Sequence, residues 1–209
     1  MRIALDAMGS EHSPAAEVEG AIAAKQEYGI DIVLVGKKDA VETEMKKHNC
    51  AFPIVEANQV IEMKDHPSEV MRDKRDSSIT VGMKLLKNKE VDAFVSAGHT
   101  GAVTTAATLI LGRIEGIERP ALCILISLPA NPILLLDVGA NANCKPDYLV
   151  QFAQMGSVYM EKIFGMERPR VGLLSNGEED IKGNSLVCEA HKLLRDTKLN
   201  FIGNIEGNN

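Results

Sequence analysis

Several residue types that mark particular protein classes are scarce in this chain. It has no tryptophan, and aromatic residues make up 4% of its 209 residues. Platforms on which bases could stack are therefore few, which argues against binding of single-stranded nucleic acid. The formal net charge of −6 argues the same way, because a phosphate backbone requires a basic face. We expect no nucleic-acid partner.

Paired cysteines and long apolar segments are also missing. The four cysteines have no Cys-x-x-Cys spacing, so neither a zinc site nor a disulfide framework is expected, and a reducing cytoplasm fits best. The most apolar stretch, 121–136, is too short to span a bilayer and is interrupted by proline and asparagine. Met1 and Arg2 lead straight into a predicted strand, without the apolar region of a signal peptide. These features predict a cytoplasmic globular protein.

Strand and helix signals alternate along the chain. Strands are predicted over 2–7, 31–36, 53–57, 93–96, 170–174 and 200–205, and helices over 14–28, 38–47, 78–87, 100–111, 147–164 and 184–195. Ser13 is the expected N-cap of the first helix, and Gly29 its end. Residues 60–76 are predicted as loops with a short helix, and 121–137 as a hairpin that turns at Pro129-Ala-Asn-Pro132.

This alternation predicts the fold class. Short connections between strands and helices indicate an α/β protein, a Rossmann-like three-layer α/β/α sandwich with a mostly parallel sheet. The hairpin would be an antiparallel excursion in that sheet. With no internal repeat or linker, residues 1–209 are expected to form a single α/β domain.

Most of the predicted strands end in small, polar, glycine-containing loops. The clearest are 5–10, 95–102, 136–146, 174–180 and 202–207. In an open α/β sheet such loops surround the usual ligand crevice, and the helix starts that follow them favour anions. The sequence therefore predicts a site for a phosphate-like ligand, built from several loops.

The segment Ser96-Ala-Gly-His-Thr-Gly-Ala102 is the strongest candidate for an anion site. Gly98 and Gly101 permit close backbone approach, while Ser96 and Thr100 add hydroxyl donors before a helix start. The segment has neither the Walker nor the Gly-x-Gly-x-x-Gly fingerprint, and an ordinary tight turn explains its glycines equally well. His99 is either a hydrogen-bond donor or acid–base group for the ligand, or a turn residue.

Other side chains also allow both functional and structural interpretations. Asp6 and Asp137 end apolar strands, where capping of a neighbouring loop is favoured over a Mg²⁺ site. The acidic run 178–180 either holds a metal or complements a helix start. Cys144 beside Lys145 has the setting of a nucleophile, but no partner histidine is placed by the sequence. The charge run 72–76 is a solvated face or a docking point for an acidic partner.

Taken together, these loops resemble those of the phosphate acyltransferase family of bacterial phospholipid synthesis. The family's Asp-Ala-Met-Gly-Gly-Asp appears as Asp6-Ala-Met-Gly-Ser-Glu11, and its Ser-Ala-Gly-Asn-Thr-Gly-Ala as Ser96-Ala-Gly-His-Thr-Gly-Ala102. Matching segments follow in order at 109–114, 117–122, 135–141, 144–146, 151–153, 177–179, 182–184 and 200–207. The chain departs from the family at Ser10, Glu11 and His99. Family members also continue well beyond the last segment, so the domain is expected to be incomplete at its C-terminus.

The resemblance implies both a fold and a reaction. The fold would be shared with isocitrate and isopropylmalate dehydrogenases and with phosphotransacetylases. The reaction would be cleavage of an acyl thioester on acyl carrier protein by orthophosphate, giving acyl phosphate and free carrier protein. The alternatives are phosphotransacetylase-like acyl transfer to coenzyme A and an inactive fragment that binds the carrier protein. No cofactor and no metal are expected.

This chemistry asks for positioning more than for strong acids or bases. Phosphate is largely dianionic near neutral pH and a thiolate leaves readily, so aligned N–H groups and small polar side chains suffice. The residues expected to act are His99 and Lys145 in catalysis, and Asp6, Ser96, Gly98, Thr100, Gly101, Asp137, Asn141, Asn143, Asn176, Glu178, Lys182 and Asn184 in substrate binding. Residues 98–101 are assigned to phosphate, and Asn141, Asn143 and Lys145 to the thioester carbonyl or the carrier's prosthetic arm.

The resemblance also implies partners and a location. These are acyl carrier protein, orthophosphate, a second copy in a homodimer and a membrane acyltransferase, in a cytoplasmic protein. Peripheral attachment to the inner face of the membrane would require the part of the family beyond residue 209. From the residues themselves, Ile202 and Ile205 predict an apolar face that further chain or a second copy would cover.

Overall fold

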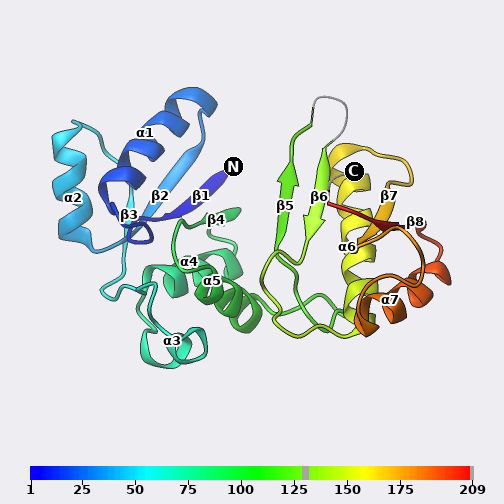
Figure 1. Ribbon diagram of the computed structural model, residues 1–209. Coiled ribbons are helices and arrows are strands. Elements are labelled where there is room, and N and C mark those ends of the chain that lie inside the picture. The colour runs from blue at the N-terminus through cyan, green and yellow to red at the C-terminus, as the bar shows by residue number, and fades with distance from the viewer. Residues whose placement is uncertain (129–131, 208–209) are drawn as a thin grey trace. The chain divides into compact units, whose positions relative to one another are not determined.

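The computed structural model describes residues 1–128 and 132–207, which form two compact units that divide after Gly112 (Figure 1). Both units combine strands and helices, and parallel strand pairs outnumber the single antiparallel pair. The α/β class with a mostly parallel sheet is therefore confirmed. The single domain predicted for 1–209 stays a prediction.

A four-stranded parallel sheet forms the centre of the first unit. In chain order its strands are β1 (Arg2–Asp6), β2 (Asp31–Gly36), β3 (Ile54–Glu56) and β4 (Ala93–Val95), and their spatial order is β3-β2-β1-β4. The chain builds outward from β1 to β3 and then returns to the opposite side of β1 with β4. The sheet therefore has a topological switch point between β1 and β4, where ligands bind in open α/β sheets.

Helices cover both faces of this sheet (Figure 1). On one face lie α1 (Ala15–Tyr28) and α2 (Lys38–Lys47), which bury Leu34 of β2 completely. On the other face α4 (Ser78–Lys87) packs near Val33, the next residue of the same strand. Successive residues of β2 thus point into different layers, which is why its sequence is one continuous apolar run. This gives the first unit the predicted three layers.

The layer on the α4 side continues through α3 (Pro67–Asp73), α5 (Thr100–Ala106) and the π-helical turn η1 (Ala107–Leu111). These helices share a core with α4, formed by Ile61, Val70, Ile79, Met83, Ala102 and Ala106. The helix predicted over 100–111 is therefore one run that widens from α to π geometry after Ala106. The short helix expected within 60–76 is α3.

Most boundaries agree with prediction within two residues, but the start of α1 differs in its capping. Pro14 occupies the N-cap position, and no side chain caps the helix. Ser13 is not the cap because its Oγ donates to the Ser10 carbonyl at 2.9 Å. The other end is as predicted, with Gly29 in left-handed geometry at φ 64°.

The second unit contains two small sheets. The strands β5 (Cys123–Ile126) and β6 (Ile133–Leu136) pair antiparallel, and β7 (Arg170–Leu174) and β8 (Asn200–Ile205) pair parallel. The predicted hairpin and final strand are thus confirmed. The hairpin is not an excursion in a larger sheet, because no backbone hydrogen bonds join β6 to β7 in the described ranges. Its predicted turn falls largely on residues 129–131, outside the described residues.

Two helices complete the second unit. The long helix α6 (Pro146–Phe164) packs against β6 and β7, and α7 (Ser185–Arg195) packs against α6 and β8. Gly156 of α6 allows the close contact with β6, since a Cβ there would lie 2.7 Å from Leu136 Cδ1. Leu134 and Leu136 therefore form the covered face of the hairpin.

The opposite face of the hairpin is apolar and open. Because side chains alternate along a strand, Ile124, Ile126 and Ile133 point away from α6. These side chains are 51%, 41% and 49% exposed. An open face of this kind favours association with another apolar surface.

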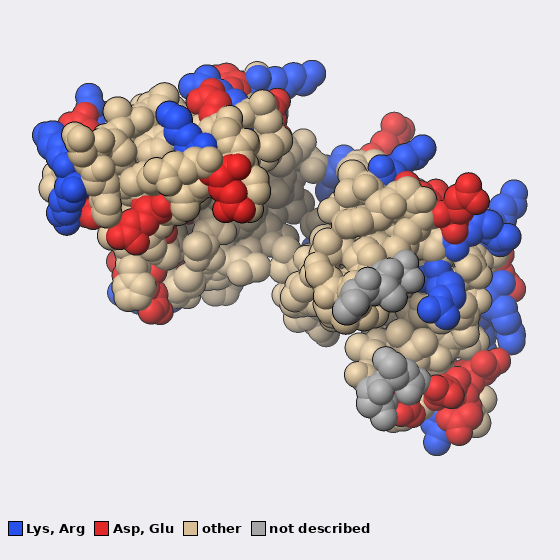
Figure 2. All heavy atoms as spheres, turned by 90° about the horizontal axis from the view of Figure 1, so that it is seen from above, with Lys and Arg blue, Asp and Glu red and all other residues tan. Residues whose placement is uncertain are grey.

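Charges of both signs lie on the surface. On the face drawn in Figure 2, Lys and Arg lie among Asp and Glu, and no broad basic area appears among the residues described there. Across the described part of the chain, no helix is long and apolar enough to cross a membrane.

The packing of α4 on β4 generates a matched test. A Cβ at Gly82 would lie 2.1 Å from Phe94 Cε2, so Gly82→Ala must displace the ring. We expect a loss of about 1–3 kcal/mol in the free energy of unfolding. The control is Gly20→Ala in α1, where nothing lies within 4 Å. It should instead gain roughly 0.5–1 kcal/mol from helix propensity. Denaturant unfolding compares the two, and a gain for both would contradict close packing of α4 on β4.

The open hairpin face should make the 209-residue chain self-associate. Replacing Ile124 and Ile126 with lysine should shift the equilibrium toward monomer, because lysine resists burial. Light scattering over a concentration series measures this shift. Ile181→Lys is the control, since Ile181 is 83% exposed in the loop after β7. A wild-type chain that stays at 22.6 kDa at every concentration would exclude the face as an association surface.

Candidate functional site

The loops after β1 and β4 meet at the switch point of the first unit's sheet. Asp6, the last residue of β1, is fully buried, and its Oδ2 accepts a hydrogen bond from Ser96 Oγ at 2.7 Å. Its Oδ1 accepts from the Met8 N–H at 3.0 Å. Ser96 Oγ in turn accepts from the Gly98 N–H at 3.0 Å. One buried carboxylate thus ties both loops together, and these donors offset the cost of burying it.

The two loops approach so closely that glycine is required on both sides. A Cβ at Gly9 would lie 2.7 Å from Asp6 Oδ2 and 2.8 Å from the Gly98 nitrogen. A Cβ at Gly98 would lie 3.2 Å from Gly9 Cα. Gly98 was identified in the sequence for close backbone approach, whereas Gly9 was missed. Its signal was a glycine three residues after a strand-ending aspartate.

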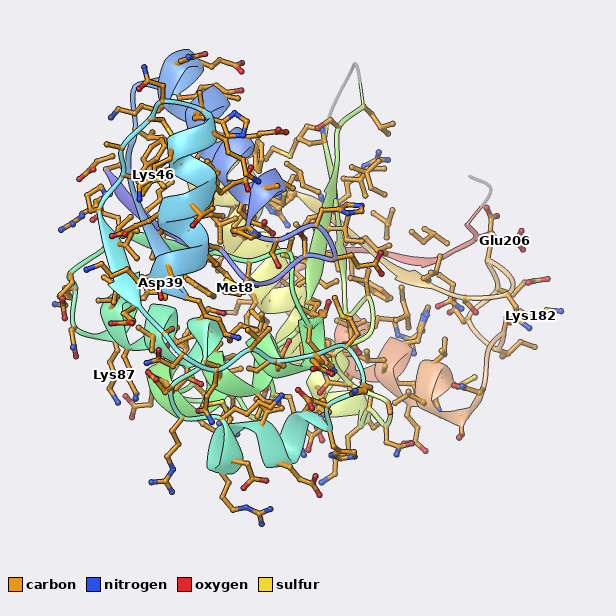
Figure 3. The ribbon with its side chains drawn as sticks, turned by 90° about the vertical axis from the view of Figure 1, so that its left-hand side faces the viewer. Met8, Asp39, Lys46, Lys87, Lys182 and Glu206 are labelled. Atoms are coloured by element: carbon orange, nitrogen blue, oxygen red, sulfur yellow. The ribbon has the colours of Figure 1, made fainter. Side chains whose placement is uncertain are left out.

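Glu17 also supports the first loop, and sequence reasoning missed it. Its Oε1 accepts from the Ser10 N–H at 3.1 Å, so the first turn of α1 reaches back to the loop. The residue is 6% exposed, and its Oε2 has no hydrogen-bond partner in the described part of the chain. An acidic residue in a first helical turn was the available signal. Met8 points toward the start of α2, where it covers Gly36 (Figure 3).

His99 lies where the second loop becomes the α5–η1 helical run. Its Nδ1 accepts a hydrogen bond from the Ala102 N–H at 3.3 Å, so His99 caps the helix. Its Nε2 lies 3.1 Å from the Asp65 carbonyl oxygen. A carbonyl only accepts, so we assign the ring proton to Nε2. Both ring nitrogens are thus engaged within the protein, and the predicted catalytic role of His99 stays a prediction.

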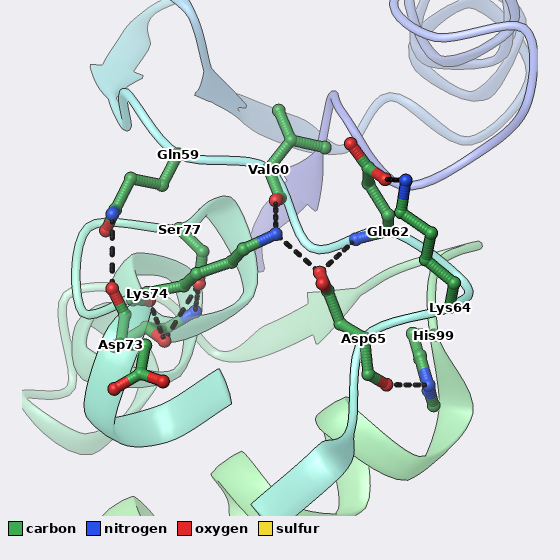
Figure 4. A network of polar contacts seen from close by, with 10 residues as sticks. Gln59, Val60, Glu62, Lys64, Asp65, Asp73, Lys74, Ser77 and His99 are labelled. Atoms are coloured by element: carbon green, nitrogen blue, oxygen red, sulfur yellow. Dashed lines mark hydrogen bonds and ion pairs between the residues drawn. The ribbon is translucent and has the colours of Figure 1, made fainter. Parts of the chain in front are cut away.

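Asp65 is held in turn by the segment between β3 and α4, as Figure 4 shows. Its carboxylate accepts from Lys74 Nζ at 2.5 Å and from the Glu62 N–H at 2.7 Å. Lys74 Nζ also donates to the Val60 carbonyl at 2.7 Å. The hydrogen bond from Lys74, followed by that from the Glu62 backbone, holds the pKa of Asp65 below its usual value. Sequence reasoning predicted loops with a short helix here and placed Lys74 in a charge run that was either a solvated face or a docking point, and it did not single out Asp65.

The start of the helical run offers N–H groups. The first N–H groups of a helix have no acceptor inside it, and those of Thr100 and Gly101 donate to no other described residue. The Thr100 side chain is exposed. A Cβ at Gly101 would lie 2.8 Å from Pro67 Cγ, so the start of α3 lies against this point. The arrangement can bind an anion through backbone N–H groups and one hydroxyl.

In the second unit Asp137 organises the loop between β6 and α6. Its Oδ1 accepts from Asn141 Nδ2 at 3.0 Å, and its Oδ2 from Cys144 Sγ at 3.0 Å. Asn141 Nδ2 also donates to the Pro120 carbonyl at 2.9 Å. Asn143 and Lys145 are exposed, and Lys145 Nζ lies 5.7 Å from the centre of the Tyr148 ring. The structure therefore joins Asp137 to Asn141 and leaves Asn143 and Lys145 open to ligands.

The thiol of Cys144 is unsuited to nucleophilic attack. Burial, followed by the hydrogen bond and charge of Asp137, raises the pKa of Cys144 to about 11. Thiolate is the reactive form of cysteine, so the group stays protonated and weakly nucleophilic near neutral pH. The sequence left a nucleophilic Cys144 open because Lys145 follows it, but Lys145 Nζ lies toward Tyr148.

The remaining predicted residues lie in the loop after β7. Asn184 caps α7 by accepting from the Val187 N–H at 3.0 Å, whereas Asn176, Glu178 and Lys182 are exposed. Figure 3 shows Lys182 at the same end of the β7–β8 pair as Glu206. The contacts of Asp180 and Asn184 in this loop are made with α7. A single site built from all the loops stays a prediction.

A buried histidine that sequence reasoning missed supports this loop. His191 of α7 is 3% exposed, and its Nδ1 lies 2.9 Å from Asn204 Oδ1. Asn204 Nδ2 donates to the Glu179 carbonyl at 2.8 Å, and His191 Nε2 lies 3.3 Å from Asp180 Oδ1. Within the described ranges, no group of three or more His, Cys, Asp or Glu side chains is arranged to hold a metal ion.

A parallel sheet with a buried acid and glycine-rich loops at its switch point is typical of α/β proteins whose ligands bind at that place. The family of this chain follows from comparison with known proteins. The chain belongs to the fatty acid synthesis protein family, whose model matches residues 1–209. This confirms the resemblance inferred from the loop motifs.

Curated relatives are named phosphate acyltransferase. The chain is 51% identical over 210 residues to that of Herpetosiphon aurantiacus, which covers 99% of this chain and 57% of the relative. It is 50% identical over 212 residues to that of Dictyoglomus turgidum, which covers 99% of this chain and 63% of the relative. The chain thus spans about three fifths of the length of these relatives.

Solved structures with a similar fold include two acyl-transferring enzymes. The EutD phosphotransacetylase from Staphylococcus aureus matches with a TM-score of 0.64 and 18% identity, over 99% of this chain and 68% of that one. A branched-chain phosphotransacylase from Enterococcus faecalis matches with a TM-score of 0.65 and 14% identity, over 98% of this chain and 67% of that one. These likenesses confirm the predicted phosphotransacetylase fold. The likeness to isocitrate-type dehydrogenases stays a prediction.

The protonated thiol gives a test of the Asp137 loop. In a variant whose only cysteine is Cys144, alkylation by iodoacetamide should stay slow until the pH nears about 11. Asp137→Asn removes a hydrogen-bonded negative charge, so the rate should rise at lower pH. Asp147→Asn, an exposed carboxylate nearby, serves as the control and should change little. Rapid alkylation of the parent variant near neutral pH would contradict the arrangement around Asp137.

Proposed function

We propose that this chain forms the larger part of a phosphate acyltransferase. The enzyme would use orthophosphate to cleave an acyl thioester on acyl carrier protein and release acyl phosphate and free carrier protein. The reaction class is supported by relatives named phosphate acyltransferase at 50% and 51% identity. The single observation that carries the phosphate site is that the Thr100 and Gly101 N–H groups donate to no other described residue, in the loop that Ser96 ties to Asp6.

The contacts divide the predicted phosphate residues into binding and positioning groups. Thr100 and Gly101 would bind phosphate, through backbone N–H groups and the Thr100 hydroxyl. The Ser96 hydroxyl proton is committed to Asp6, so Ser96 would act by holding the Gly98 N–H in place. Asp6 would position both loops without touching the ligand, because its oxygens already accept from the protein.

The same reasoning applies to the predicted thioester residues. Asn141 Nδ2 has two N–H donors, and these already serve Asp137 and the Pro120 carbonyl. Asn141 would therefore shape the loop, while the exposed Asn143 and Lys145 would contact the thioester carbonyl or the prosthetic arm. In the loop after β7, Asn176, Glu178 and Lys182 would contact substrate from exposed positions, whereas Asn184 would hold the start of α7.

The reaction needs no covalent enzyme intermediate. An oxygen of phosphate attacks the thioester carbon and forms a tetrahedral oxyanion, which collapses as the C–S bond breaks. The thiolate of the carrier's prosthetic arm leaves and takes a proton from solvent, giving acyl phosphate. Positioning of phosphate and polarisation of the carbonyl supply the rate enhancement. The raised pKa of Cys144 supports direct attack, because it weakens the cysteine that the sequence offered as a candidate nucleophile.

The proposed setting follows the reaction. A second copy of the chain would complete a homodimer through apolar surface such as the open hairpin face. The enzyme would act in the cytoplasm, where its free cysteines would stay reduced. A membrane acyltransferase would consume the acyl phosphate. Any attachment to the inner face of the membrane would use chain beyond residue 209.

The reaction and the phosphate site are tested together. The protein is incubated with acyl-[acyl carrier protein], and free thiol and hydroxylamine-trapped acyl phosphate are measured over a series of phosphate concentrations. We expect both products to form in equal amounts and only with phosphate present. Thr100→Val removes a donor to a charged ligand and should lower kcat/KM for phosphate about tenfold or more. Thr105→Val, in the same helix but beyond its first turn, should leave it unchanged.

The alternatives give different outcomes in the same assay. The phosphotransacylase fold favours acyl transfer between phosphate and coenzyme A, which would appear as faster turnover of acyl-coenzyme A than of the acylated carrier protein. A non-catalytic fragment would bind the carrier protein without releasing thiol. Either outcome would replace the proposed reaction.

A further inference from the structure

The ring of His99 lies between two groups with opposite requirements. At Nδ1 the Ala102 N–H needs an acceptor, 3.3 Å away, and at Nε2 the Asp65 carbonyl needs a donor, 3.1 Å away. Neutral imidazole with its proton on Nε2 satisfies both groups. The other neutral tautomer and the imidazolium both place an N–H against the Ala102 N–H. The tautomer of His99 is therefore set by the two neighbours together.

The position of the Asp65 carbonyl depends on the side chain of the same residue. Lys74 Nζ contacts the Asp65 carboxylate at 2.5 Å and is itself held by the Val60 carbonyl at 2.7 Å (Figure 4). The Glu62 N–H binds the same carboxylate oxygen at 2.7 Å. The Asp65 and Lys74 side chains are 21% and 27% exposed, so solvent screens this pair only partly. The segment before α4 thus presents a fixed carbonyl to His99.

We propose that Asp65 and Lys74 are positioning residues for the anion-binding loop, and that they act by keeping the His99 proton on Nε2. This rests on the proposed phosphate site at residues 98–101. With the proton on Nε2, His99 occupies the Ala102 N–H and fixes the first turn of α5. The Thr100 and Gly101 N–H groups, which donate to no other described residue, are then held in a fixed turn at the start of α5. His99 itself does not touch the anion.

This arrangement predicts the sign of a pH effect. Protonation of His99 at Nδ1 turns the cap into a donor that faces another donor, so the ring must leave Ala102. The first turn of α5 loosens, and affinity for an anion falls as the pH is lowered. A His99 that binds the anion directly predicts the opposite, because an imidazolium attracts an anion. The two roles are therefore distinguished by the direction of the change.

The neighbouring charges do not reproduce this effect. Asp6 from β1 and Glu62, Lys64, Asp65, His66 and Lys74 from the segment between β3 and α4 are charged or titratable groups near the loop, and α3, which packs on α5, adds Glu69, Arg72 and Asp73. Hydrogen bonds within the Glu62–Lys64 and Asp65–Lys74 pairs lower the pKa of both carboxyls and raise that of Lys64, so Glu62, Lys64 and Asp65 keep their charges between pH 5 and 8. His66, the N-cap of α3, is a second histidine near the loop, so His66→Gln serves as a control.

Asparagine would meet the requirements of this position without titrating. Its Oδ1 accepts a hydrogen bond and its Nδ2 donates one, as Nδ1 and Nε2 of His99 do here. Asparagine is also a strongly preferred N-cap. In the family motif that residues 96–102 resemble, the position of His99 is occupied by asparagine. His99→Asn is therefore the conservative variant that separates capping from titration.

Sulfate is the probe, because it stays dianionic between pH 5 and 8 and so does not itself titrate. Its dissociation constant is measured by calorimetry on the 209-residue chain across that range. The dissociation constant of the wild type for sulfate should rise about tenfold on acidification, which is the size expected for the loss of one helix-capping hydrogen bond. His99→Ala should bind weakly at every pH. His99→Asn should bind better than His99→Ala and lose the pH dependence, and His66→Gln should keep it.

Lys74→Met tests the second half of the proposal. It should weaken sulfate binding at high pH and make the His99 tautomer mixed, which ¹⁵N chemical shifts of the ring report without any ligand. Thr105→Val should leave both the tautomer and the affinity unchanged. If the His99 proton stays on Nε2 in Lys74→Met as it does in the wild type, the proposed role of the Lys74–Asp65 pair is overturned, whether or not sulfate binds.

The remaining outcomes separate this proposal from the phosphate site itself. Tighter sulfate binding at low pH, lost in His99→Asn, would show direct contact with His99 and overturn the capping role. A sulfate affinity that does not change with pH and is the same in all variants would overturn the capping role as well. Sulfate affinity that Thr100→Val leaves unchanged would remove the phosphate site from this loop, while the ¹⁵N shifts would still decide how the His99 proton is held.

Discussion

The buried carboxylate of Asp6 is the constraint on which the first unit's site depends. A fully buried charge is costly unless nearby donors compensate it, and those donors come from the loops after β1 and β4. Satisfying Asp6 therefore brings Ser96 to the end of β1 and draws Gly98 against Gly9. The strand order β3-β2-β1-β4 makes this possible, because it places β4 beside β1 at the switch point.

Because of this constraint, side chains hold the loops while backbone groups are left for a ligand. The side chains of Asp6, Ser96 and His99 form hydrogen bonds that hold the loops, so few of their donors and acceptors remain for a ligand. The groups left open are backbone N–H groups and the Thr100 hydroxyl. Such a site suits the proposed chemistry, in which the reactant is already an anion and needs placement rather than deprotonation. It also explains why the described residues need not include a catalytic triad.

The second unit repeats the principle with a different outcome. Asp137 directly follows β6 and again accepts hydrogen bonds from the following loop, here from Asn141 and Cys144. The contact with Asp137 that shapes the loop also lowers the reactivity of the Cys144 thiol. Burial and a nearby negative charge both disfavour the thiolate form. A residue with the sequence setting of a nucleophile thus becomes a structural donor, and Asn143 and Lys145 remain exposed.

The sequence by itself determined the order of strands and helices, the α/β class, the family and the loops that carry polar residues, because periodicity and strand-ending glycine loops are local signals. It identified Asp6, Ser96 and Gly98 as candidates but not their mutual contacts. It missed Gly9, Glu17 and Asp65, and it left His99 undecided. Only the tertiary structure shows the contacts that these residues make, since Asp65 and His99 lie 34 positions apart in the chain and Asp6 and Ser96 lie 90 apart. Whether a polar side chain binds a ligand or holds the fold depends on which donors and acceptors the packing brings to it.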